Sequence, residues 1–171
     1  YPEMVSLCDG VSSFVEVRLE DDFKLTPEAL ERACTKKSKV LVLNYPNNPT
    51  GASFTRKELE ALVEVCLRKG IYIISDEVYE KLLYDGDEHV SVASLSPEAK
   101  AITITTNGVS KTYAMTGWRL GFAAGPAELI AAMIEIQGHM NTNTSSITQY
   151  ASVEALTGSQ DAVGVMVKEF K

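Results

Sequence analysis

Apolar residues follow two different patterns along this chain. Val40 to Asn44 (VLVLN) and Ile71 to Ser75 (IYIIS) are continuous apolar runs that end in polar residues, which is typical of buried parallel strands. The segment between these runs has apolar residues at helical spacing. They are Leu59, Leu62, Val63, Cys66 and Leu67. Strand, helix and strand in this order predict a βαβ unit with parallel strands.

Local motifs set the limits of the helix in this unit. Thr55 followed by Glu58 has the spacing of a capping box, and Gly70 is a residue type that commonly follows a helix end. We therefore expect a helix from about Arg56 to Lys69. The turn before it, Tyr45 to Gly51 (YPNNPTG), contains prolines and a glycine that disfavour a helix there.

Other segments carry weaker signals for strands and helices. Alternating apolar and polar residues predict strands at Ser12 to Leu19, Ala101 to Thr106 and Trp118 to Ala124. Short helices are expected at Tyr1 to Asp9 and after Thr26, where Pro27 occupies a favoured first helical position. Longer helices are expected after Pro126, with Leu129, Ile130, Met133 and Ile134 facing inward, and from about Thr144 to Gly158. Val78 to Tyr84 is expected as a short helix or turn, and Gly86 to Lys100 as a polar connection.

Candidate chemical groups follow the buried strands. Asp76 comes directly after the second apolar run, Asn48 follows the first, and Lys111 lies on the turn that leaves the strand ending near Thr106. In parallel sheets, ligands bind beyond the carboxyl ends of the strands. We therefore expect Asn48, Asp76 and Lys111 to lie at one edge of the sheet.

Composition narrows the class of protein. The 171 residues are 45% hydrophobic and 23% charged, as in a soluble globular protein of one α/β unit. A formal charge of −7 argues against nucleic-acid binding, and no apolar run approaches the roughly 20 residues that span a bilayer. The three cysteines form no C-x-x-C pair, which favours reduced thiols and a cytoplasmic location.

The stretch from Gly108 to Phe122 (GVSKTYAMTGWRLGF) places Arg119 eight positions after Lys111. A desolvated lysine amine can form an imine with a carbonyl group, and an arginine can hold a phosphate with two parallel hydrogen bonds. A solvated surface turn is the alternative for an isolated Ser-Lys-Thr sequence. The complete stretch, however, resembles the pyridoxal-phosphate attachment signature of class I/II aminotransferases. Its lysine carries the cofactor as an imine in that family, and its arginine holds the cofactor phosphate.

Two further motifs support this resemblance. Asn47 to Gly51 (NNPTG) is similar to the family turn whose asparagine, here Asn48, donates to the cofactor 3′-oxygen. Ser75 to Tyr79 (SDEVY) is similar to the motif in which Asp76 pairs with the pyridine nitrogen and the Tyr79 hydroxyl meets the 3′-oxygen. Ser110 is expected to add a hydroxyl to the phosphate site. The chain departs from the pattern at Gly108, where many relatives have a serine.

The resemblance implies a fold and a reaction. The expected fold is a three-layer α/β/α arrangement with a mostly parallel sheet, as in fold type I enzymes. Residues 1–171 would form part of the cofactor-binding large domain, without an N-terminal segment and a C-terminal small domain, and would be inactive alone. The full-length protein is expected to be a homodimer that transfers an amino group from aspartate, alanine or an aromatic amino acid to a 2-oxo acid such as 2-oxoglutarate, without metal. Lys111 would act as general base and acid.

Other functions remain open from the sequence. A β-lyase, a synthase or another pyridoxal-phosphate enzyme of the same fold would share these motifs, as would a transcription regulator with an aminotransferase-like domain that senses the cofactor. An NTPase with IYIISDE as a magnesium-binding strand end would need a G-x-x-x-x-G-K-[ST] loop. The chain lacks that loop.

Overall fold

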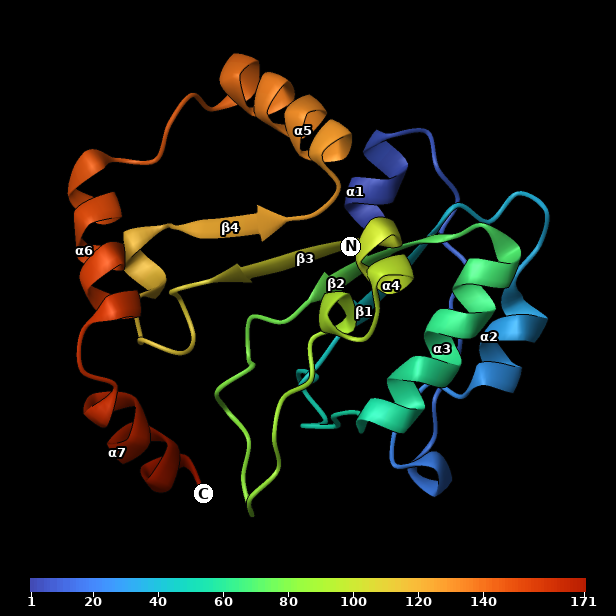
Figure 1. The fold of residues 1–171 in the computed structure, drawn as a ribbon, viewed down its shortest axis with the longest axis horizontal. Helices are drawn as coiled ribbons and strands as arrows, with labels where there is room; N and C mark the ends of the chain where they lie inside the picture. Colours follow the sequence, from blue (N-terminus) through green and yellow to red (C-terminus); the bar gives the residue numbers. More distant parts are fainter.

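The protein contains one sheet of four strands in the order β1-β2-β3-β4 (Figure 1). The structure is a computed structural model that describes residues 1–171. The strands are β1 (Val40–Asn44), β2 (Tyr72–Asp76), β3 (Thr103–Gly108) and β4 (Gly121–Ala124). β1, β2 and β3 are parallel neighbours, and β4 pairs with β3 in the antiparallel direction. The prediction of an α/β chain with a mostly parallel sheet is confirmed.

The chain also contains seven α-helices. They are α1 (Pro2–Leu7), α2 (Pro27–Ala33), α3 (Arg56–Lys69), α4 (Pro97–Ile102), α5 (Ala127–Met140), α6 (Ser146–Thr157) and α7 (Asp161–Phe170). Short 3-10 helices occur at Leu19–Asp21, Val92–Ser94 and Thr116–Trp118. Figure 1 shows α2 and α3 together at one end of the molecule and α6 and α7 at the other. None of these helices has the length and apolar character needed to cross a membrane.

Helix α3 connects β1 to β2 and has the predicted limits. The Thr55 hydroxyl accepts a hydrogen bond from the Glu58 amide, and the Glu58 carboxylate accepts one from the Thr55 amide, so the capping box is complete. Gly70 ends the helix at φ 65°, a left-handed conformation that glycine adopts without strain. These local signals explain why the sequence was sufficient to place this helix.

The core lies between α3 and one face of the sheet. It includes Leu43 of β1 and Ile73 of β2, packed with four of the five residues of the predicted apolar stripe: Leu59, Leu62, Val63 and Cys66. The prediction was wrong for Leu67, which is 40% exposed, whereas Val65 is buried. With about 100° of rotation per residue, Leu67 falls just outside the buried arc.

Strand alternation places Asp76 on the other face of the sheet. Ile73 and Ser75 of β2 are buried toward the core, so Tyr72, Ile74 and Asp76 project to the opposite side. Tyr72 is 45% exposed there. A polar side chain at the end of β2 therefore stands clear of the core and can contact a ligand beyond the strand ends.

Two predicted strands differ from the structure. Ser12 to Leu19 forms no strand: the ladders join only β1 to β4, and Phe14 is 77% exposed. Its alternation was real, but a strand also needs a neighbour with free backbone groups. The strand predicted from Trp118 begins only at Gly121, because Trp118 lies in a 3-10 helix and Arg119 has φ 54°.

Helical segments account for the remaining differences. Ala101 belongs to α4, which begins after Ser96 in the segment predicted as a polar connection; the Ser96 hydroxyl caps the amide of Ala99. The expected inward orientation on α5 was wrong for Met133 and Ile134, which are 40% and 63% exposed. Helix α7 was not predicted. Amphipathic spacing shows that a helix has an apolar face, but not which part of the protein covers that face.

Candidate active site

The carboxyl ends of the parallel strands meet at Asp76. Asn44 of β1 and Thr106 of β3 lie beside Asp76 in the strand register. The Asn44 side-chain amide donates to the Asp76 carbonyl oxygen at 3.2 Å, and the Val78 amide donates to Asp76 Oδ1 at 3.3 Å. These two hydrogen bonds hold the backbone and one carboxylate oxygen of Asp76 in place.

A second contact to Asp76 comes from the start of the chain. The Tyr1 hydroxyl donates a hydrogen bond to Asp76 Oδ2. Burial and the neighbouring carboxylate both raise the pKa of Tyr1, so the phenol keeps its proton and remains a donor. The sequence predicts Tyr1 only as part of a short helix, because no local pattern connects it with a residue 75 positions later.

Asn48 and Tyr79 are joined directly. The Asn48 side-chain amide donates to the Tyr79 hydroxyl at 3.1 Å, which links the turn after β1 to the turn after β2. Backbone hydrogen bonds close the first of these turns, from Asn47 to Ala52 and from Gly51 to Asn47, both at 2.8 Å. Gly51 has φ 72°, a conformation that favours glycine.

Lys111 reaches the same group from the turn after β3. Its ammonium nitrogen lies 5.5 Å from the centre of the Tyr79 ring, within the range of a cation–π contact. No carboxylate forms a salt bridge with Lys111. Tyr79 therefore contacts both Asn48 and Lys111, so side chains that follow β1, β2 and β3 lie together.

Arg119 and Ser110 share a neighbouring hollow of about 270 Å³. Its other lining residues are Val78, Asn107, Gly108, Leu120 and Gly121. Arg119 donates from one guanidinium nitrogen to the Thr116 carbonyl at 2.9 Å and forms no salt bridge with a carboxylate. A larger hollow of about 400 Å³, between Glu16 and Arg32, contains none of the predicted site residues.

Packing explains the glycine at position 108. A Cβ atom on Gly108 would lie 2.9 Å from the Leu120 carbonyl oxygen and 3.2 Å from Gly121 Cα. The end of β3 therefore approaches the start of β4 too closely for a side chain. The departure from the family pattern noted above is a steric requirement of this β3–β4 pair.

Comparison with known proteins identifies the family of this chain. The model of the family described as "Aminotransferase class I and II" matches residues 1–171. The chain belongs to this family. It is 50% identical over 171 residues to an aspartate aminotransferase of Geobacillus stearothermophilus, covering 100% of this chain and 44% of that protein. It is 47% identical to an aspartate/prephenate aminotransferase of Cereibacter sphaeroides over 100% of this chain and 43% of that protein.

Solved structures of this family have the same fold. An aspartate aminotransferase from Rhizobium meliloti matches with a TM-score of 0.96 and 42% identity, covering 99% of this chain and 43% of that one. The Thermus thermophilus aspartate aminotransferase with maleate matches with a TM-score of 0.90 and 44% identity, over 99% and 43% of the two chains. The chain therefore spans less than half the length of these aminotransferases.

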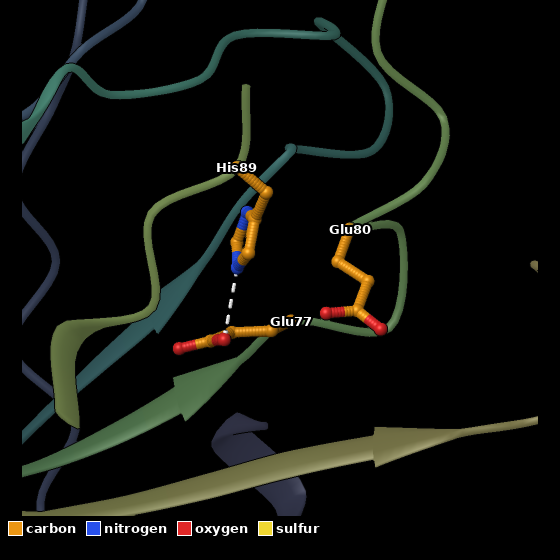
Figure 2. Close-up of side chains that lie close together, drawn as sticks. All are labelled: Glu77, Glu80 and His89. Atoms are coloured by element: carbon orange, nitrogen blue, oxygen red, sulfur yellow. Dashed lines mark hydrogen bonds and ion pairs between the residues drawn. The ribbon is translucent and has the colours of Figure 1, made fainter. Parts of the chain in front are cut away.

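Behind the site, a buried hydrogen-bond network surrounds Glu77. Glu77 is only 1% exposed. One of its carboxylate oxygens lies 2.9 Å from His89 Nε2, as Figure 2 shows. Ser75, Ser91 and the Val92 amide donate to its other oxygen at 2.7, 3.0 and 3.3 Å. Burial alone would raise the pKa of Glu77, but these hydrogen bonds and the His89 charge outweigh it and lower the pKa.

The Glu77 network ties the segment around His89 to the end of β2. The Tyr45 hydroxyl donates to Glu77 at 3.3 Å and accepts from the Val92 amide at 3.1 Å, and the His89 ring stacks on Tyr45 at 5.2 Å between ring centres. A carboxylate oxygen of Glu80 lies within 4.8 Å of a carboxylate oxygen of Glu77 and of a ring nitrogen of His89, and Figure 2 shows the three side chains together. The sequence signal was weak: Glu77 continues the inward alternation of β2, but no motif pointed to His89.

Replacing Glu77 by alanine is expected to destabilise the full-length protein by about 3–5 kcal/mol, because it leaves His89 and several donors buried without their acceptor. The free energy of urea unfolding measures this change, and Glu64→Ala, at a side chain 80% exposed, is the control. Folding lowers the pKa of Glu77 below its ordinary value of 4.5. The stabilisation of the folded state by this carboxylate is therefore present above pH 4.5 and is lost as the pH falls through the lower pKa of the folded state. Equal losses for both variants would show that the network does not stabilise the fold.

Proposed function

We propose that the full-length protein is a pyridoxal-phosphate-dependent aminotransferase in which Lys111 carries the cofactor. The observation that supports this most directly is the position of Lys111, which lies against Tyr79 at the carboxyl edge of the sheet and pairs with no carboxylate. A lysine in that position is available for a carbonyl group. Membership of the class I and II aminotransferase family supports the same assignment.

The side chains present fit pyridoxal phosphate. A phosphate needs cationic and hydroxyl donors. Arg119 and Ser110 line one hollow, and Arg119 forms no salt bridge with a carboxylate. A pyridine nitrogen that must stay protonated needs a carboxylate, which Asp76 supplies from the end of β2. A ring hydroxyl needs polar partners, and Asn48 and Tyr79 already lie together at 3.1 Å. Each donor and acceptor has a chemical counterpart on the cofactor.

When bound, the cofactor supplies an electron sink for the bonds around the substrate Cα. In the proposed reaction, the Lys111 amine removes the proton from the substrate Cα and returns a proton in the later half of the transfer. Asp76 holds the positive charge on the pyridine nitrogen, which makes that electron sink effective. Asn48 and Tyr79 orient the ring through its 3′-oxygen, while Ser110 and Arg119 fix the phosphate and so keep the ring in register with Lys111.

We propose aspartate as the amino donor and a 2-oxo acid such as 2-oxoglutarate as the acceptor, with alanine and aromatic amino acids as further donors. The names of the relatives from Geobacillus stearothermophilus and Rhizobium meliloti favour aspartate. We also propose a homodimer, as is usual in this family, and a cytoplasmic location, which the three free cysteines favour. Because the chain spans 44% of such relatives, we propose that residues 1–171 are part of the large domain and do not transaminate alone.

An assay of the full-length protein with aspartate and 2-oxoglutarate tests the proposal. We expect oxaloacetate and glutamate to form in equal amounts. When aspartate is added without 2-oxoglutarate, only the first half of the reaction can occur, and we expect the visible absorbance spectrum of the bound cofactor to change. Release of ammonia together with a 2-oxo acid, and no glutamate, would instead indicate the lyase alternative. Absence of any turnover with tightly bound cofactor would favour the cofactor-sensing regulator.

A further inference from the structure

The Asp76 carboxylate is held by a neutral donor that no motif assigns. Its Oδ2 atom accepts a hydrogen bond from the Tyr1 hydroxyl, and its Oδ1 atom accepts one from the Val78 amide at 3.3 Å. No lysine, arginine or histidine forms a salt bridge with Asp76. The Tyr1 phenol is therefore the one side chain that donates a hydrogen bond to this carboxylate.

We propose that Tyr1 is a positioning residue that keeps the Asp76 carboxylate aimed at the pyridine nitrogen of the cofactor. This inference rests on the proposed function, because it assumes that a cationic ring nitrogen lies opposite Asp76. It goes beyond that function in giving the first residue of the chain a defined task at the site.

The physical reason is the number of partners that a carboxylate needs. An ionised carboxylate has about four acceptor positions, and the Val78 amide occupies one of them weakly at 3.3 Å. A hydrogen bond from the phenol occupies a second position and restricts rotation of the side chain. Lone pairs remain for the N–H group of the ring. A lysine in place of Tyr1 would instead pair with the charge and compete with the ring nitrogen.

The phenol is suited to this task because it stays neutral. Tyr1 is 51% exposed, but its partial burial and the adjacent Asp76 charge raise the pKa of its hydroxyl, so the phenol stays protonated and donates at neutral pH. Loss of the hydroxyl would leave Asp76 oriented by one backbone amide alone. The ring nitrogen would then hold its proton less firmly, and the proton of the lysine-bound cofactor, no longer repelled by that positive charge, would be lost at a higher pH.

The variant Tyr1→Phe in the full-length holoprotein tests the proposal, since it removes only the hydroxyl. We expect the affinity for pyridoxal phosphate to fall up to about tenfold, because binding then has to order the Asp76 side chain that Tyr1 otherwise holds in place. We also expect the pH midpoint of the visible absorbance of the bound cofactor to rise. Tyr84→Phe, at an exposed tyrosine whose hydroxyl makes no hydrogen bond, is the matched control and should leave both quantities unchanged.

A double-mutant cycle separates this role from a merely structural one. If Tyr1 acts through the Asp76 charge, Tyr1→Phe should change neither the affinity nor the pH midpoint further in the Asp76→Asn background. Unchanged values in the single variant, or equal effects in both backgrounds, would overturn the inference while leaving the proposed function intact. A wild-type protein that binds no cofactor at Lys111 would refute the proposed function itself, and the inference with it.

Discussion

Replacing Lys111 by alanine in the full-length protein is expected to abolish covalent attachment of pyridoxal phosphate and to lower kcat/KM for amino transfer by about 10⁴-fold or more. The loss is large because one amine has two tasks: it holds the cofactor, and it moves the proton at the substrate Cα, a task that alone contributes about 10²–10⁴-fold. The measurement is kcat/KM with aspartate and 2-oxoglutarate, together with the visible absorbance of the purified protein.

Two controls accompany the Lys111 variant. Lys100→Ala, at an exposed residue in the last turn of α4, should retain wild-type activity. Lys111→Arg keeps the positive charge but offers no amine for an imine, so it should be as inactive as Lys111→Ala. Substantial activity in the arginine variant would mean that the charge of Lys111, and not its nucleophilic amine, is what the site requires.

Asp76→Asn is expected to have the second largest effect, a fall in kcat of about 10²-fold or more. The asparagine amide has nearly the shape of the carboxylate, so the backbone contacts to Asn44 and Val78 should persist. What changes is the charge: a neutral amide does not hold a cationic pyridine nitrogen, and the ring then accepts electrons poorly. Steady-state kcat and single-turnover rates with aspartate measure this loss.

The control for Asp76 is a carboxylate outside the site. Asp87→Asn, at an exposed residue, should leave kcat unchanged. Asp76→Glu keeps the charge at a longer reach and should recover part of the lost rate. If the asparagine variant retained full kcat, the ring nitrogen would not need an anionic partner, and the role proposed here for Asp76 would be wrong.

The βαβ unit could be predicted because each of its signals is local. The capping box at Thr55 and Glu58 and the glycine after Lys69 are read within a few residues, and the structure places the helix as expected. Grouping of Asn48, Asp76 and Lys111 at one edge followed from a general rule, since parallel strands bring their carboxyl ends together. The geometry of Asn48, Tyr79 and Lys111 agrees with that expectation.

The features that could not be predicted depend on partners far apart in the sequence. The contact of Tyr1 with Asp76 joins residues 75 positions apart, and the pairing of Glu77 with His89 depends on how a loop folds back onto β2. Ile134 has the spacing of a core residue but is 63% exposed. Periodicity identifies an apolar helix face or an alternating segment. Tertiary packing determines which other part of the protein covers that face or pairs with that segment.

The most direct test of the central claim is chemical reduction of the cofactor onto the protein. The full-length holoprotein is treated with borohydride, digested and analysed by mass spectrometry. We expect one modified peptide, carrying the reduced pyridoxyl phosphate group on Lys111. A modified peptide that contains another lysine, with Lys111 unmodified, would contradict the assignment of Lys111 as the residue that carries the cofactor.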